Sequence, residues 1–179
     1  ARMQDPDTIA GRVFAERIYG DHPYGRPSAG EPETVEAITV DDLRGFVERR
    51  IARDNLIVGV VGDISAAELA SRLDEVFGGL PENASPWEIE PADLKFSGGV
   101  VVEPLAIPQS RILFAQPGIS RDDPDYYAAY VANHILGGGG FSARLYTEVR
   151  EKRGLAYSAG SYLASSDAAN VLAGSAGTQ

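Results

Sequence analysis

The sequence predicts an α+β fold in which helices cover antiparallel sheets. Several segments, beginning with residues 7–19, place apolar side chains on one face at helical spacing. Other segments are short apolar runs bounded by turn residues, which is typical of buried strands. These runs cluster in the sequence instead of alternating strictly with helices. Such clustering favours antiparallel sheet over a parallel βαβ arrangement.

Two helices in the first eighty residues have clear start signals. Thr39 and Asp42 match a capping box, and Ser65 and Glu68 match a second one. An amphipathic pattern follows each box. The apolar run at residues 55–62 lies between the two helices and predicts a buried strand.

The later part of the chain is predicted to contain four strands and two helices. Acidic residues and a proline at 122–125 open the first of these helices, and the glycine run 137–140 ends it. The second helix is expected over residues 141–152. The strands are expected at residues 100–103, 111–115, 155–163 and 169–176.

A polar stretch with three prolines divides the chain at residues 81–99. Such a segment is typical of a linker between domains. We therefore expect residues 1–80 to be the C-terminal part of a first α+β domain, and residues 100–179 to be the N-terminal part of a second. Both ends of the sequence resemble the interior of a longer chain, so a fragment is expected.

Composition excludes several classes of function. The 179 residues carry a formal net charge of -10, which argues against a nucleic-acid partner. The absence of cysteine removes disulfides, thiolate metal sites and cysteine nucleophiles. No apolar stretch approaches the roughly 20 residues of a membrane span. The composition is compatible with both the bacterial periplasm and the cytoplasm.

The sequence predicts no metal site in this chain. A zinc peptidase needs two histidines one helical turn apart and a carboxylate ligand. The only histidines are His22, in a loop, and His134, in a helix. They are far apart in sequence, and neither has a second ligand at a suitable spacing. His22 is expected to order its loop, and His134 to be a hydrogen-bonded helix residue.

Glycine and serine residues suggest other sites, each with a structural alternative. Gly137 to Gly140 precede a helix as phosphate-binding loops do, but they follow no strand and no Gly-Lys-Ser/Thr completes the motif. A helix-to-helix joint, or close approach of a peptide backbone, are the alternatives. Ser161 and Ser175 follow glycines in strand patterns but lack a suitable histidine.

The stretch 141–158 resembles a signature of the pitrilysin/insulinase-type zinc peptidases. It reads Phe-Ser-Ala-Arg-Leu-Tyr-Thr-Glu-Val-Arg-Glu-Lys-Arg-Gly-Leu-Ala-Tyr-Ser, and the glycine run precedes it. From composition alone, this stretch would be predicted to be a solvated helix face followed by a strand. Residues 21–27, together with residues 38–43 and the run 58–63, are similar to the first domain of the same family, which includes mitochondrial processing peptidase.

The resemblance implies an α+β protein whose zinc motif, His-x-x-Glu-His, lies upstream of residue 1 or in a partner chain. It also implies that Arg150 and Tyr157 match an arginine–tyrosine pair of the family's non-catalytic half. That tyrosine is placed to donate a hydrogen bond to the scissile carbonyl, and that arginine helps to hold the substrate. A donor at developing charge is worth about 2.7–4 kcal/mol. Zinc-bearing halves contain a similar stretch, but the glycine run followed by Phe141 and Ser142 favours the zinc-lacking partner.

Two functions follow as expectations from the resemblance. The first is a component of a zinc metalloendopeptidase that supplies substrate-binding residues, with a peptide substrate and a zinc-bearing half or subunit as partners. This chain alone would then be inactive. The second is a structural homologue that forms a chamber wall and cleaves nothing, like the core proteins of respiratory complexes.

Overall fold

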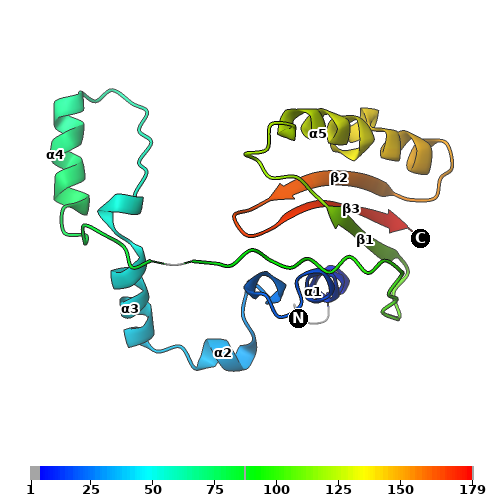
Figure 1. Cartoon of the computed structure of the whole chain (residues 1–179), viewed down its shortest axis with the longest axis horizontal. Coiled ribbons are helices and arrows are strands. Elements are labelled where there is room, and N and C mark those ends of the chain that lie inside the picture. The colour runs from blue at the N-terminus through cyan, green and yellow to red at the C-terminus, as the bar shows by residue number, and fades with distance from the viewer. Residues whose placement is uncertain (1–4, 87, 179) are drawn as a thin grey trace. The chain divides into compact units, whose positions relative to one another are not determined.

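The computed structural model describes residues 5–86 and 88–178, and the chain divides into two compact units (Figure 1). One unit combines Ala1–Ala29 with Ile89–Gln179 and contains the sheet, so we call it the sheet unit. The other, Gly30–Glu88, contains helices and loops, and we call it the helical unit.

The sheet unit contains a three-stranded antiparallel sheet. Its strands are β1 (Ser110–Pro117), β2 (Ser158–Ser165) and β3 (Asn170–Thr178), in the order β1-β3-β2. Gly174 of β3 lies opposite Phe114 of β1 and Ser161 of β2. Because β3 is central, it contains buried side chains such as Val171, which is 3% exposed. The antiparallel sheet and the β2–β3 hairpin confirm the predicted fold class for this part of the chain.

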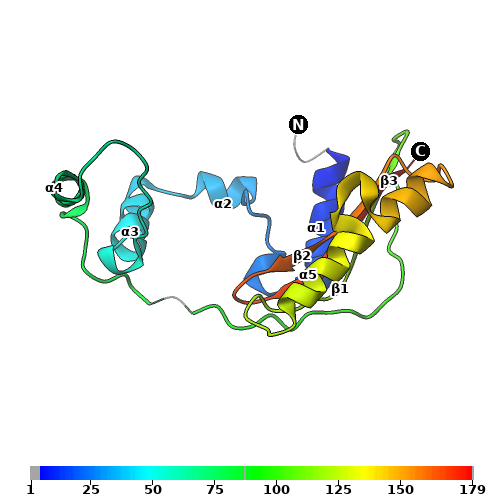
Figure 2. The ribbon, with the colours of Figure 1, turned by 90° about the horizontal axis from the view of Figure 1, so that it is seen from above.

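Helices lie on both faces of this sheet (Figures 1 and 2). On one face α5 (Tyr126–Asn133) continues into a π-helical turn, η4 (His134–Gly138), and then into η5 (Gly140–Ser142) and a second π-helical turn, η6 (Tyr146–Glu151). On the other face lies α1 (Pro6–Tyr19), which contacts β1. Asp5 caps α1 by accepting a hydrogen bond from the Thr8 amide at 2.9 Å. A short 3-10 helix, η2 (Pro23–Gly25), follows.

The helical unit contains α2 (Pro32–Glu36), α3 (Val40–Arg50), η3 (Arg53–Asn55) and α4 (Ala66–Phe77). Both predicted capping boxes are confirmed. The Thr39 hydroxyl accepts from the Asp42 amide at 3.2 Å, and the Asp42 carboxylate accepts from the Thr39 amide at 2.9 Å. Ser65 and Glu68 form the same reciprocal pair at 3.3 Å each. The sequence analysis did not anticipate α2.

Two of the predicted strands are wrong. Residues 55–62 and 100–103 contain no strand. Ile57 is 97% exposed and Val61 is fully exposed, although their pattern is that of a buried strand. A strand forms only when a neighbouring strand accepts its backbone hydrogen bonds, and the described residues offer these runs no such neighbour. The described residues therefore form one antiparallel sheet, and the predicted second sheet is not found among them.

The predicted linker, residues 81–99, has no helix or strand among its described residues, and it is fixed at both ends. The Arg53 amide donates to the carbonyl of Pro81 at 2.9 Å, so the beginning of the stretch belongs to the helical unit. The Lys95 amide donates to the carbonyl of Ile18 at 2.8 Å, within the sheet unit. The compact units therefore place α1 with the later residues. The assignment of residues 1–80 and 100–179 to consecutive family domains stays a prediction. No helix in the described part of the chain is both long and apolar enough to span a bilayer.

Candidate functional site

The predicted pair Arg150 and Tyr157 meets in the structure. Arg150 is near the end of η6, and Gly154 turns the chain with a φ of 61°, a conformation that glycine adopts without strain. The Tyr157 amide then donates to the carbonyl of Gly177 at 2.7 Å, which joins it to β3 just before β2 begins. As a result, the guanidinium carbon of Arg150 lies over the Tyr157 ring, 5.2 Å from its centroid. The two side chains are therefore in contact, and their role in substrate binding stays a prediction.

Two further aromatic residues belong to this cluster, and the sequence analysis gave them no role. The Arg150 guanidinium donates to the Tyr146 hydroxyl through Nη1 and lies over the Tyr146 ring, 4.8 Å from its centroid. The Phe141 ring meets the Tyr146 ring edge to face, with centroids 5.1 Å apart. The spacing of four residues between Tyr146 and Arg150 places them on one helical face, and this signal could have linked them. We call Phe141, Tyr146, Arg150 and Tyr157 the aromatic–arginine cluster.

Arg150 has no carboxylate partner among the described residues, although the chain is strongly acidic. Glu148, which is also in η6, accepts from Lys152 at 2.7 Å. This hydrogen bond, together with the charge of Lys152, lowers the pKa of Glu148, so Glu148 is ionised and already paired. The remaining N–H groups of the Arg150 guanidinium can therefore donate to an acceptor from outside the cluster.

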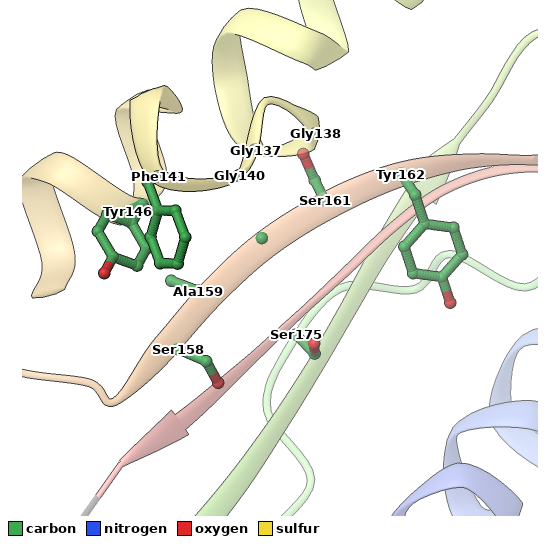
Figure 3. A pocket seen from close by; sticks show the side chains of 11 residues that line it. Gly137, Gly138, Gly140, Phe141, Tyr146, Ser158, Ala159, Ser161, Tyr162 and Ser175 are labelled. Carbon is green, nitrogen blue, oxygen red and sulfur yellow. The ribbon is translucent and has the colours of Figure 1, made fainter.

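An open pocket of about 430 Å³ adjoins the cluster (Figure 3). Phe141 and Tyr146 lie together on the helical side of β2, whereas Tyr162 points to the opposite side. Glycines of the run 137–140 form part of the wall. The remaining lining residues are Ser158, Ala159, Gly160, Ser161 and Ser175. No charged side chain lines the pocket.

Glycine at position 137 allows the helical segment to lie directly on the sheet. A Cβ atom there would be 2.4 Å from both the amide nitrogen and the hydroxyl of Ser161. The Ser161 hydroxyl itself donates to the side-chain oxygen of Asn133 at 2.8 Å, and both residues are buried. Ser161 therefore has a packing role. Gly140, in contrast, has a φ of 61° and open space around it at the pocket wall.

The two histidines do not form a zinc site. His22 Nδ1 accepts from the Tyr24 amide at 3.2 Å, and its Nε2 lies 2.9 Å from the carbonyl oxygen of Glu90, to which it donates. Both ring nitrogens thus order the loop, as the sequence analysis expected. His134 lies in η4 beside Gly139. Across residues 5–86 and 88–178, no three His, Asp or Glu side chains gather as a metal site would require. The described residues therefore do not fit zinc.

Comparison with known proteins identifies the family. Residues 37–179 match the model described as the peptidase M16 inactive domain. The chain is 32% identical over 132 residues to an uncharacterised zinc protease of Streptomyces coelicolor, covering 70% of this chain and 28% of that protein. It is 31% identical over 129 residues to a probable inactive metalloprotease of Bacillus subtilis, covering 72% and 30%.

A solved structure supports the same assignment. The crystal structure of a peptidase M16 inactive domain from Pseudomonas fluorescens aligns with a TM-score of 0.84 and 33% identity, covering 99% of this chain and 43% of that chain. The chain thus spans less than half the length of these relatives. On the sequence match and the shared fold, the chain belongs to the peptidase M16 family, the pitrilysin/insulinase family, and its residues 37–179 match the inactive domain of that family.

Proposed function

We propose that this chain is the peptide-binding, zinc-free part of a metallopeptidase, and that Arg150 and Tyr157 contact the peptide. The observation that carries the proposal is the stacked pair itself: a guanidinium 5.2 Å from the centroid of a tyrosine ring that is 77% exposed. An arginine buried for packing alone would be expected to have a carboxylate partner. This one keeps donors available for a carbonyl or carboxylate of a ligand.

The neighbouring strand supports a peptide as the ligand. β2 pairs only with β3 among the described strands, so no strand covers its other edge. An extended peptide adds to such an edge by main-chain hydrogen bonds and places alternate side chains in adjacent pockets. The open pocket is lined by Ser158 to Tyr162 of this strand, and the glycines of its wall allow close approach of a backbone. The Tyr157 hydroxyl would then donate to a peptide carbonyl.

Kinetics of the complete enzyme test the proposal, with this chain assembled with the zinc-bearing half or subunit and a fluorogenic peptide as substrate. Tyr157→Phe removes one donor and should lower kcat at least about tenfold, since a donor at developing charge is worth a few kcal/mol. Arg150→Ala should mainly raise KM. Tyr127→Phe is the matched control, because Tyr127 is 80% exposed on α5 and lies outside the cluster. Parent kinetics in both cluster variants, with normal assembly, would refute the proposal.

A second candidate is a homologue that forms a chamber wall and cleaves nothing. It is favoured by the relative described as a probable inactive metalloprotease and by His22, whose two ring nitrogens are both hydrogen-bonded within the chain. The coding sequence upstream of Ala1 and the neighbouring gene distinguish the two candidates. A His-x-x-Glu-His motif in either supports the peptidase component, and its absence from both favours the wall-forming homologue.

A further inference from the structure

Tyr146 is the residue that connects the pocket with the predicted substrate-binding pair. Its hydroxyl accepts from Arg150 Nη1, and its ring lies 4.8 Å from the guanidinium carbon. The same ring packs against Phe141 and lines the pocket. Phe141 and Tyr157 are each 77% exposed, whereas Tyr146 and Arg150 are half-buried. Tyr146 is thus the inner member of the aromatic–arginine cluster, with solvent-facing rings on either side.

Arg150 needs a fixed partner to hold one position. A free arginine side chain has roughly 2 kcal/mol of rotamer entropy, and ordering it on one exposed ring recovers only about 0.5–1 kcal/mol. Tyr146 adds a second ring and a hydrogen bond with defined direction. The helix geometry supports this contact, because η6 begins at Tyr146 and its π-helical turn includes Arg150.

The pocket selects the kind of side chain that reaches Tyr146. Its lining consists of glycines, two aromatic rings from the helical segment, and uncharged residues of β2 and β3. Burial of an unpaired charge against such a lining is costly, whereas an apolar or hydroxyl-bearing side chain is accommodated. A group that fills the pocket touches the ring that also holds Arg150.

We propose that Tyr146 is a positioning and specificity residue: it holds the Arg150 guanidinium on Tyr157, and it links Arg150 to an uncharged peptide side chain in the pocket. The proposal rests on the proposed function for its ligand, but its first half concerns only the free chain. The hydroxyl of Tyr146 fixes the direction of the guanidinium. The ring supplies the pocket wall.

The free chain provides a test that needs no substrate. Protons beside the Arg150 guanidinium lie over two aromatic rings, so their NMR signals should be shifted upfield from ordinary arginine values. Tyr146→Leu should remove a large part of that shift, and Tyr146→Phe should retain most of it because the ring remains. Tyr127→Leu is the control and should leave it unchanged. Backbone signals of β2 and β3 report whether each variant is folded. An Arg150 signal that is unchanged in folded Tyr146→Leu overturns the proposal.

The assembled enzyme tests the link to specificity. Sets of fluorogenic peptides are compared by kcat/KM. Within each set, one position carries Leu, Phe, Asp or Lys, and each set varies a different position along the peptide. At the position that fills the pocket, Leu or Phe should exceed Asp and Lys at least about tenfold. Tyr146→Leu should raise KM at least about fivefold and reduce that preference. Tyr146→Phe should restore the preference but keep a KM above that of the parent.

The outcomes separate this inference from the proposed function. If Arg150→Ala and Tyr157→Phe leave cleavage unchanged, the proposed function fails, while the NMR result still decides whether Tyr146 holds Arg150. If those two variants are impaired but Tyr146→Leu keeps the parent KM and peptide preference, the proposed function stands and the role of Tyr146 is refuted.

Discussion

The two units of the chain differ in what holds them together. In the sheet unit, β3 and the helical segments around it bury side chains such as Val171, Ala173 and Ala143, each no more than 3% exposed. In the helical unit, Ala52 is the one buried apolar residue among those described. Its helices are amphipathic, yet Leu43 of α3 remains 58% exposed. Local signals are therefore enough to specify helices, but a core requires a second layer to cover them.

Amide hydrogen exchange should show the largest difference between the units. Amides of β3 are hydrogen-bonded on both sides of a central strand and should exchange at least about a hundredfold more slowly than those of residues 56–61. Residues 40–50 should exchange at intermediate rates because α3 is hydrogen-bonded but unpacked. Exchange followed by mass spectrometry or NMR gives the measurement. Strong protection of residues 56–61 from exchange would mean that they pair with a strand. The inferred difference between the two units would then be wrong.

Glycine substitutions should show that the sheet unit is more closely packed than the helical unit. A Cβ atom at Gly174 would lie 2.2 Å from the Phe114 ring and 2.6 Å from the carbonyl oxygen of Gly160. Gly174→Ala should therefore lower the free energy of unfolding of the sheet unit by about 1–3 kcal/mol or more, since strands and ring must shift. Gly59 has open space around it, so Gly59→Ala should stay within about 0.5 kcal/mol.

Urea denaturation followed by far-ultraviolet circular dichroism measures both variants. If the Gly174→Ala protein is as stable as the parent, the sheet and the Phe114 ring can accommodate the added methyl group. The close packing inferred for this unit would then be wrong.

The helical elements were predictable because their signals are local. Thr39 with Asp42, and Ser65 with Glu68, start their helices within one residue of the predicted positions. The hairpin of β2 and β3 was predictable from two apolar runs joined by a short polar turn. The apolar run at residues 55–62 carried an equally strong strand signal and failed, since strand formation depends on a partner that the pattern does not contain.

The candidate site was predictable in part. The resemblance identified Arg150 and Tyr157, and a helix end, a glycine turn and a strand start in close succession explain why their side chains meet. The contribution of Phe141 and Tyr146 was not predicted. The spacing of four residues could have linked Tyr146 to Arg150, but the ring contact of Phe141 depends on side-chain directions beside a π-helical turn that helical periodicity does not describe. The placement of α1 in the sheet unit was also missed, since contacts over such long sequence separations have no local signature.

Gly11→Ala should have a smaller effect, and in the stabilising direction. Gly11 lies in the interior of α1, in the sheet unit, and a Cβ atom there would meet nothing within 4 Å. Alanine restricts the unfolded chain and favours the helix, so unfolding should cost about 0.5–1 kcal/mol more. Thermal and urea unfolding provide the measurement. No gain would indicate that α1 is not folded together with the sheet.

The smallest expected effect concerns the start of α3 in the helical unit and depends on pH. Hydrogen bonds from the Thr39 hydroxyl and amide lower the pKa of Asp42 below its ordinary 3.8. A lowered pKa means that the ionised carboxylate stabilises the folded helix start. This contribution is fully present above pH 3.8 and is lost as the pH falls through the lowered pKa.

Thr39→Ala should therefore reduce the helicity of the first turn of α3 at pH 7, by the loss of a cap worth about 1 kcal/mol. At a pH below the lowered pKa of Asp42, the helicity of parent and variant should differ less. The hydrogen bond that the Asp42 carboxylate accepts from the Thr39 amide is then already weakened in the parent. Cα chemical shifts of residues 40–43 report this directly. Thr39→Ser is the control and should follow the parent at every pH, since it keeps the hydroxyl. Because the described part of this unit buries so little apolar surface, packing should not mask the loss of a cap. A difference in helicity that is equally large at both pH values would show that Asp42 does not contribute to the capping box.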